Sequence, residues 1–560
     1  MNTNYNKSWV YQKREITLGR GVAYGLTDLM GGGWNNIVSG VIFTFVLYNG
    51  ISPALAGAIA GIGRIIDAVF SLFIGSITDN FHKTTLGKRF GRRHFIFGVG
   101  ILAFAMVFPF FWVSTTNWVY YLFVYCVLEI IIAFILIAWE TLPTEMTDDY
   151  KLRTILSGSR MVISAAGTSF VFIMLYALKS LNSRNAYLIA GVAYTFVFVV
   201  GMLISWRLTW ERPLTKKVLE ELDSAEKSSP KKIIKDYISV FRNKAFRKHL
   251  TVYIFSFTGK DFFQILLPTF VVYSLLMNDS DPWLINALSF VGIFISILAA
   301  WLMIKTGPKF LFAVSYSLII FVLVAFTVLN YLDIRNRAVM LPIIIILGVI
   351  WQVGRSTLEF IPWNIFPFIP DIDYIMTREA RAGVYAAVMT FFRKSTGAVA
   401  AWIAGILLEA IDFVQAPSKM CSLDKNVSSL KYATEESCLK AHGEWAATGS
   451  DQIHEYALQL DATKPWNEIK LGFILVLGTG LLIVIALIVS QTFRLNRQTH
   501  ATLKQEIARL ENGGLKEDVS PDTRKVIEQL TGHPYEESWP AKSTDDQSSS
   551  KTTKEKERLK

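Results

Sequence analysis

Residues 64–93 read RIIDAVFSLFIGSITDNFHKTTLGKRFGRR and decide the fold of this chain. The apolar run carries Arg64 and Asp67 three residues apart, on one face of a helix, and ends at Asp79. A charge at mid-bilayer costs about 2.5 kcal/mol or more, so ionisable groups inside a span usually line an ion or solute path. The loop that follows is strongly basic, which predicts a cytoplasmic position for Lys83, Lys88, Arg89, Arg92 and Arg93. The stretch therefore predicts a membrane span, its orientation and a candidate site.

The composition is that of a membrane protein. Of the 560 residues 52% are apolar and only 18% are charged, and the mean hydropathy is +0.37. The net charge of +11 collects in short loops and in the tail, where topology and anionic lipid headgroups explain it. We therefore expect no nucleic-acid binding. The first residues, MNTNYNKSWVYQKRE, are polar, so the first apolar helix is expected to act as the insertion signal.

The chain contains twelve runs long and apolar enough to span a bilayer, which takes about 20 residues. Their approximate bounds are 22–48, 53–78, 95–113, 117–141, 157–178, 187–207, 249–275, 284–304, 309–330, 339–365, 382–412 and 468–491. The sequence thus predicts an all-α membrane protein with twelve transmembrane helices. Lys and Arg concentrate in alternate connections, which predicts that both termini are cytoplasmic. The small residues of LAGAIAGIG, 55–63, permit close approach of a neighbouring helix.

The long polar stretch 208–248 divides these runs into six and six. We expect a six-helix bundle over 1–207, a solvated cytoplasmic linker over 208–248 and a second six-helix bundle over 249–495. A long external loop is expected over 413–466 and a cytoplasmic tail over 496–560, with helices near its start, one capped by Ser520, and a low-complexity, disordered end from about 541.

The external loop holds Cys421 and Cys438, two of only three cysteines. In an oxidising compartment these would form a disulfide, and otherwise they would be free thiols in a variable loop. The residues leave both open.

No motif of a membrane enzyme is present. The seven histidines are scattered, and the chain lacks an HExxH motif, a Walker lysine loop and a nucleophile elbow. We therefore expect neither enzymatic activity nor ATP-driven transport, and no catalytic residue, metal site or cofactor apart from a coupling ion.

Charged groups instead occur singly on several predicted spans, and we expect those of both halves to converge on a central path. They are Asp28, Arg64, Asp67, Glu129, Glu140, Lys260, Asp261, Arg355, Glu359 and Lys394. Arg355 and Glu359, four residues apart, form either a self-contained helix pair or part of the site. Glu129 is expected near the outer interface. Lys260 and Asp261 are adjacent and are expected to face different directions.

Four patches, in chain order, resemble the glycoside–pentoside–hexuronide:cation symporters, the melibiose-permease-like branch of the major facilitator superfamily. They are AYGLTDLMGG (23–32) with ISPALAG (51–57), RIIDAVFSLFIGSITD (64–79), AWETLPTEMTDDYKLRT (138–154) and PWNIFPFIPDIDYIMTREARAGVYAAVMTFFRKS (362–395). The resemblance covers about residues 20–412. It implies two six-helix bundles in an inner or plasma membrane and transport by alternating access.

The resemblance also implies residue roles. Asp67 matches the first of two acids at the family's cation site, Lys394 matches the lysine that reaches this site, and Arg64 and Ser71 complete the candidate cation-coupling group. Trp139 would stack on a sugar face, while Arg160 and Thr390 would hydrogen-bond to it. The remaining substrate-binding candidates are Asp28, Glu140, Glu359, Trp363 and Lys394. The resemblance implies a cytoplasmic gate formed by Asp79, Arg89, Arg92, Arg93, Glu145, Asp149 and Arg153.

Two acids of the family pattern are missing, because Ser71 and Ile135 stand in their places. A sodium site prefers several oxygens and more than one carboxylate, so a proton is the more natural coupling ion, with sodium still open. The leading prediction is a secondary transporter for a sugar or glycoside-like solute. An amphipathic lipid-like cargo, which the apolar Ile135 would suit, an uncoupled uniporter and a non-transporting membrane sensor are the alternatives. We expect a monomer whose partners are a small-molecule substrate and membrane lipid.

Overall fold

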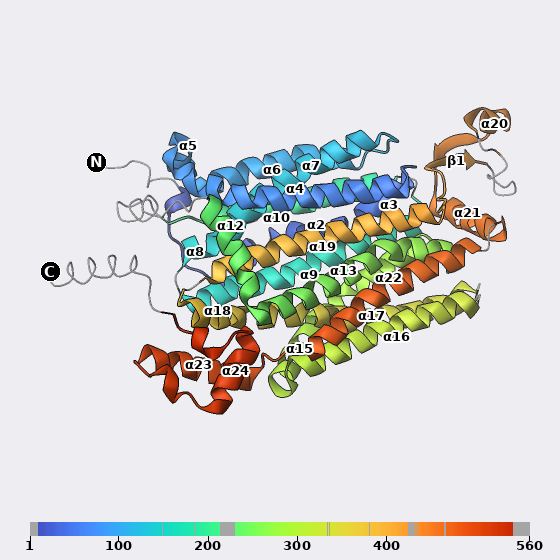
Figure 1. Ribbon diagram of the computed structural model, residues 1–560. Coiled ribbons are helices and arrows are strands. Elements are labelled where there is room, and N and C mark those ends of the chain that lie inside the picture. The colour runs from blue at the N-terminus through green and yellow to red at the C-terminus, as the bar shows by residue number, and fades with distance from the viewer. Residues whose placement is uncertain are drawn as a thin grey trace.

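The computed structural model is an elongated bundle of long helices with smaller units at its two ends (Figure 1). It describes residues 9–147, 149–183, 185–212, 230–332, 334, 336–379, 381–423, 432, 434–463 and 466–540.

The first half starts with η2 (Trp9–Tyr11) and a segmented long helix. Its segments are α1 (Leu18–Gly25), α2 (Asp28–Asn36), the π-helical turn η3 (Ile37–Val41) and α3 (Ile42–Tyr48). The other long helices are α4 (Pro53–Asn80), α6 (Arg92–Phe111), α7 (Trp118–Glu140), α9 (Tyr150–Ser180) and α10 (Ala186–Leu208). Short helices η4 (Phe81–Lys83), α5 (Thr85–Phe90) and α8 (Leu142–Met146) connect them.

The second half follows α12 (Pro230–Ser239) and η5 (Val240–Arg242). Its long helices are α13 (Lys244–Tyr273), α15 (Val291–Thr306) with the preceding α14 (Asp281–Ala287) and η6 (Leu288–Phe290), α16 (Pro308–Leu332), α17 (Arg337–Ile365), α19 (Ala382–Ala410) and α22 (Trp466–Gln491). η7 (Phe366–Phe368) and α18 (Ile369–Thr377) join α17 to α19. Between α19 and α22 lie β1 (Lys419–Ser422), α20 (Glu435–Lys440), β2 (Glu444–Ala447) and α21 (Ser450–Thr463), with β1 and β2 paired antiparallel.

Eleven helical segments in the described part of the chain are long and apolar enough to cross a membrane. They coincide, within several residues at most ends, with eleven of the twelve predicted runs. The remaining run corresponds to α13, which carries Lys260 and Asp261 near its middle and is buried along almost its whole length. A helix surrounded by other helices can hold charges that lipid would not tolerate. Its assignment as a span, and hence the total of twelve, stays a prediction.

The two ends of the bundle differ. One end, here called the terminal end, contains α5, α8, α12, α18 and the tail helices α23 (Arg497–Glu511) and α24 (Pro521–Thr531) (Figure 1). The opposite end, here called the loop end, contains β1, α20 and α21. That the terminal end faces the cytoplasm stays a prediction from its basic loops.

Helices α4 and α19 are the closest link between the two halves. A Cβ atom on Gly57 would lie 2.5 Å from the carbonyl oxygen of Ala401, and one on Gly405 would clash with the carbonyl of Pro53. Farther along, a Cβ on Gly61 would lie 3.2 Å from the carbonyl of Ala398. The predicted role of the small residues in 55–63 is thus confirmed, because their backbones touch a neighbouring helix.

The prediction of a solvated linker is wrong for its first residues. Trp210 and Glu211 are buried at the terminal end, 1% and 2% exposed, because Glu211 caps the start of α6.

The start of the tail is an ordered unit. The Ser520 side chain accepts a hydrogen bond from the Thr523 N–H, which confirms the predicted cap of α24. Asp371 of α18 pairs with His500 and Lys504 of α23, both at 2.8 Å. The predicted disordered stretch, 541–560, lies outside the described residues.

Candidate functional site

Asp67 and Lys394 meet across the two halves. Lys394 Nζ of α19 donates hydrogen bonds to Asp67 Oδ1 and Ser71 Oγ of α4, each at 2.6 Å. Ser71 Oγ in turn donates to Asp67 Oδ1 at 3.2 Å. The Asp67 side chain is 10% exposed and that of Lys394 is 21% exposed. The group predicted from the family pattern is therefore assembled, with Ser71 binding the amine at the position of the missing acid.

Arg64 lies one turn before Asp67 and is buried, but it makes no hydrogen bond through Nε or Nη2 to the described residues. A Cβ on Gly397 of α19 would lie 3.8 Å from Arg64 Nε and 3.4 Å from Asp261 Oδ2. Arg64 therefore points toward α19 and the second half.

A cluster around Arg160 in the first half contains four of the predicted substrate residues. Arg160 of α9 donates from Nε to Asp28 Oδ2 at 3.1 Å and from Nη2 to Glu140 Oε1 at 2.6 Å. Its guanidinium lies 4.7 Å from the centre of the Trp139 ring. The Trp139 ring is fully buried, stacks on Tyr24 and donates from Nε1 to the Tyr24 carbonyl at 3.0 Å. In this conformation its neighbours are protein groups, and its role in binding a sugar stays a prediction.

A second cluster lies in the other half. Lys260 pairs with Asp261 at 2.8 Å and with Glu359 at 2.9 Å, and Arg355 reaches the same Glu359 oxygen at 3.3 Å. Arg393 of α19 pairs with Asp261 at 2.8 Å. Arg355 and Glu359 are therefore not a self-contained pair. The expectation that Lys260 and Asp261 face different directions is wrong, because the long lysine side chain folds back onto its neighbour.

Asn36 links the two halves at the end of α2. Its Oδ1 accepts hydrogen bonds from Gln264 at 3.2 Å and Arg355 at 3.4 Å, while its Nδ2 donates to Thr168 at 2.9 Å. Asp28 lies at the start of the same helix, about 12 Å away at 1.5 Å per residue. The two clusters therefore flank one helix, which continues into the π-helical turn η3.

The other substrate candidates have fewer polar contacts. Trp363 is 45% exposed and contacts the Tyr253 and Phe366 rings, with centroids 5.9 and 6.2 Å away. Thr390 is exposed on α19.

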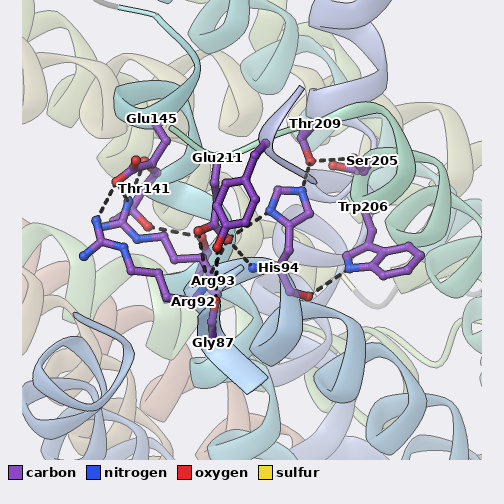
Figure 2. A network of polar contacts seen from close by, with 12 residues as sticks. Gly87, Arg92, Arg93, His94, Thr141, Glu145, Ser205, Trp206, Thr209 and Glu211 are labelled. Carbon is purple, nitrogen blue, oxygen red and sulfur yellow. Dashed lines mark hydrogen bonds and ion pairs between the residues drawn. The ribbon is translucent and has the colours of Figure 1, made fainter. Parts of the chain in front are cut away.

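Three of the predicted gate residues, Arg92, Arg93 and Glu145, form a network within the first half (Figure 2). Arg92 Nη2 and Arg93 Nη1 of α6 lie 2.6 and 3.3 Å from Glu145 Oε1 of α8, and Arg93 also donates to the Thr141 carbonyl at 2.9 Å. Glu211 accepts the backbone N–H groups of Arg92, Arg93 and His94 at 3.1, 2.9 and 2.7 Å. The first turn of a helix leaves such N–H groups without partners, and a carboxylate suits them well.

Burial alone would raise the pKa of Glu211. The hydrogen bond and charge of the His94 ring, 3.1 Å away, together with the backbone N–H groups, hold this pKa below its usual range instead. Glu211 thus fixes the linker to the base of α6, as Figure 2 shows.

The remaining gate candidates have local contacts. Asp149 caps α9 by accepting the Leu152 N–H at 2.9 Å, and Arg153 Nε donates to the Thr147 carbonyl at 2.8 Å. Arg89 is exposed and lies 5.1 Å from the centre of the Phe90 ring. The side chain of Asp79 lies outside the described residues. Action of these groups as a gate between the halves stays a prediction.

The two halves touch at the loop end. Lys179 at the end of α9 pairs with Asp279 at 2.5 Å, and both are buried. The Tyr48 hydroxyl donates to the Thr448 carbonyl at 2.8 Å, and Asn182 donates to Asp451 at the same distance. With the glycine contacts of α4 and α19, these bonds close the loop end in this conformation.

The loop unit contains the cysteine pair. Cys421 and Cys438 form a disulfide with Cα atoms 5.4 Å apart. Gly443 leaves room for it, because a Cβ there would lie 2.6 Å from Cys421 Sγ and 2.8 Å from Cys438 Sγ.

Several polar residues were missed or misplaced from the sequence. Asn36, Gln264 and Arg393 were not selected, although amide and charged residues on apolar runs are a usable signal. Glu211, which lies in the linker and not on an apolar run, was not selected either. Glu129, expected near the outer interface, is fully buried and accepts a hydrogen bond from Trp34 Nε1 at 3.3 Å.

Known proteins of similar sequence are transporters. A relative in Synechocystis sp., described as an uncharacterized symporter, is 23% identical over 464 residues, which cover 68% of this chain and 83% of the relative. The uncharacterized symporter YjmB of Bacillus subtilis is 24% identical over 418 residues, which cover 72% of this chain and 86% of the relative.

Solved transporter structures share the fold. A bacterial homologue of the human lysosomal transporter Spinster, in an inward-facing and unoccupied conformation, has a TM-score of 0.54 at 14% identity and covers 85% of this chain and 96% of its own. A bacterial homologue of the human drug peptide transporters has a TM-score of 0.51 at 12% identity and covers 85% of this chain and 98% of its own. These similarities show a major facilitator fold.

The model of one family, described as MFS/sugar transport protein, matches residues 23–434, which reach from the first half to beyond α19 of the second half and include the helices of the Asp67–Lys394 group. The chain is accordingly a multi-pass membrane transporter rather than an enzyme, and it belongs to the MFS/sugar transport protein family.

Proposed function

We propose that this transporter moves a sugar or glycoside-like solute together with a cation, with a proton as the leading choice. The observation that carries the proposal is the pairing of Lys394 with Asp67 across the halves. Protonation of Asp67 would remove the charge that holds the amine. Helices α4 and α19 form the closest contact between the two halves. Release of the Asp67–Lys394 ion pair would therefore permit the two halves to separate during alternating access.

Polar groups suited to hydroxyl recognition support the choice of cargo. The side chains of Glu140, Arg160 and Glu359 are 42%, 33% and 33% exposed, although they lie on long apolar helices. Their exposed parts leave room for water or a polar solute beside them. Carboxylates accept hydrogen bonds from sugar hydroxyls and guanidinium groups donate to sugar oxygens.

The case for a lipid-like cargo is weaker. Ile135 was its main support, but this side chain is fully buried and packs on α6, where a Cβ on Gly100 would lie 2.6 Å from Ile135 Cγ1. Its apolar character therefore serves helix packing.

Uptake into proteoliposomes tests the proposal. A panel of labelled mono- and disaccharides would be offered with an inward proton gradient, with a sodium gradient or with neither. We expect accumulation above the external concentration with the proton gradient, and its loss with a protonophore or in Asp67→Asn. Accumulation with the sodium gradient alone would show that sodium, and not a proton, is the coupled ion. Equilibration without accumulation would reject the coupling of solute transport to a cation. Binding in a thermal-shift assay without any flux would reject transport of these solutes.

A further inference from the structure

Glu129 of α7 is a buried acid that the proposed mechanism has not used. It is 1% exposed and accepts one hydrogen bond, from Trp34 Nε1 to Oε2 at 3.3 Å. Its other oxygen, Oε1, has no hydrogen-bond partner in the part of the chain that the structure describes. Within the same part, no Lys, Arg or His forms an ion pair with it.

Two further groups near Glu129 are also unsatisfied. The hydroxyl of Tyr125, one turn earlier on α7, faces the Glu129 carboxylate but makes no hydrogen bond of good geometry to the described residues. The Tyr125 ring packs on Gly63 of α4, and the charge of the next residue, Arg64, acts on both Tyr125 and Glu129, although its Nε faces α19. Arg64 contributes two buried donors without partners, Nε and Nη2. Native interiors rarely leave this many polar atoms unpaired at one place without a functional reason.

The charged and titratable groups that face Glu129 can be named. They are Arg64 and Asp67 on α4 and Tyr125 and Cys126 on its own helix, with the neutral Trp34 on α2. Helix α6 also packs on α7, but its ionisable residues, Arg92, Arg93 and His94, are bound at the terminal end by Glu145 and Glu211.

An ionised carboxylate at this position would be expensive. Burying an ion costs several kcal/mol unless a counter-ion and further hydrogen bonds compensate it. Glu129 has one indole donor and no paired cation. A neutral carboxylic acid avoids this cost, and the oxygen of the neighbouring Tyr125 hydroxyl can accept a hydrogen bond from it.

We propose that Glu129 is a proton-carrying site of the transport cycle and supplies the second exchangeable acid that is absent at Ser71 and Ile135. The inference rests on the proposed proton-coupled function. A proton from water on one side binds the carboxylate and forms one O–H bond. When the helices rearrange, that bond breaks, the proton leaves to water on the other side, and the unpaired N–H groups of Arg64 take over the carboxylate. In the conformation with a closed loop end, Glu129 holds the proton.

Infrared difference spectroscopy of the full-length protein in proteoliposomes tests the protonation directly and needs no substrate. A protonated buried carboxylic acid has a C=O stretching band that a carboxylate lacks. We expect this band in the wild type at neutral pH, its loss in Glu129→Gln and its retention in the matched control Asp28→Asn, whose acid is paired with Arg160. In Trp34→Phe, which removes the indole donor, we expect the band to shift. No band in the wild type, or an unchanged band in Glu129→Gln, would overturn the proposal. If Glu129→Gln does not fold, the Trp34→Phe spectrum tests the protonation of Glu129 instead. An unshifted band in Trp34→Phe would then overturn the proposal.

The role in coupling has its own readout. In proteoliposomes loaded with the pH dye pyranine, we expect solute-driven proton entry in the wild type and its loss in Glu129→Gln, with solute exchange retained. Proton entry at the wild-type rate in Glu129→Gln would reject the role in coupling. If the wild type moves no solute at all, the proposed function fails, whereas the infrared result still decides the protonation of Glu129.

Discussion

Lys394 of α19 donates a hydrogen bond to Asp67 of α4, with 2.6 Å between Nζ and Oδ1, and thereby joins two helices from opposite halves. Ser71 binds the same amine at 2.6 Å, so a neutral hydroxyl occupies the place of a second acid. One negative charge therefore balances one positive charge, and the pair becomes unbalanced as soon as Asp67 is protonated or Lys394 is removed.

The balance of this pair can be tested by mutation. We expect Lys394→Met to destabilise the protein by about 3–5 kcal/mol, because it leaves Asp67 buried without its counter-ion. The double variant Lys394→Met/Asp67→Asn should recover most of this loss, since no unpaired charge remains. Thermal unfolding followed by tryptophan fluorescence measures both. Lys440→Met, which removes an exposed amine paired with Glu436, is the control. Equal instability of the single and double variants would contradict the pairing.

A second prediction concerns the closed loop end. We expect Gly405→Ala to disfavour closure, because the added methyl meets the backbone of Pro53 and backbone cannot move aside as a side chain can. Gly383→Ala is the matched control on the same helix, since nothing lies within 4 Å of a Cβ there.

Spin labels at Leu181→Cys and Leu439→Cys, both exposed at the loop end, report the separation in a Cys126→Ser background. We expect a longer mean distance in Gly405→Ala only. The same distance distribution in all three proteins would show that close α4–α19 contact does not control this end.

The spans were predictable because a bilayer demands about 20 apolar residues, and apolar runs such as those at α7 and α16 are visible in any sequence. The contact between Asp67 and Lys394 was predicted from the family pattern and not from their spacing in the sequence, because 327 residues separate them. Glu211 could not be found, since its partners, three backbone N–H groups and the His94 ring, lie more than 100 residues away along the chain. The prediction for Lys260 and Asp261 was wrong because adjacency in the chain fixes the directions of the two Cβ atoms, but not the position of the amine at the end of a flexible lysine side chain.

Glu211 makes the stability of the first half pH-dependent. Its pKa is lower in the folded protein than its ordinary value, so the stabilisation is complete above that ordinary value and is lost as the pH falls through the folded value. We expect Glu211→Gln to lower stability by about 2 kcal/mol at neutral pH, the order lost with hydrogen bonds to a charged group. Melting temperatures across the acidic range should fall less steeply in Glu211→Gln than in the wild type. Parallel curves would show that Glu211 is not the titrating group.

The disulfide gives a prediction for the loop unit. Bridging Cys421 and Cys438, 17 residues apart, is expected to stabilise this unit by about 3 kcal/mol through the loss of chain entropy on unfolding. Alkylation of protein from an oxidising compartment should modify only Cys126 until a reductant is added. Limited proteolysis should cut Cys438→Ser faster than wild type between α19 and α22, with Cys126→Ser as the control. Alkylation of all three cysteines without reduction would reject the bridge.

Trp539 attaches the tail to α18, the short helix between α17 and α19. Its ring lies 4.4 Å from the Arg378 guanidinium and 5.9 Å from the Tyr374 ring, and its backbone N–H donates to the Ile375 carbonyl at 2.7 Å. We expect Trp539→Ala to weaken this attachment by about 1–2 kcal/mol, from the lost cation–π and ring contacts. Hydrogen exchange of α18 should then be faster, while that of α16, which lies outside this contact, stays unchanged. Leu515→Ala, an exposed tail position, is the control and should leave α18 at the wild-type rate. Wild-type exchange of α18 in Trp539→Ala would mean that the ion pairs of Asp371 with His500 and Lys504 hold the tail in place on their own.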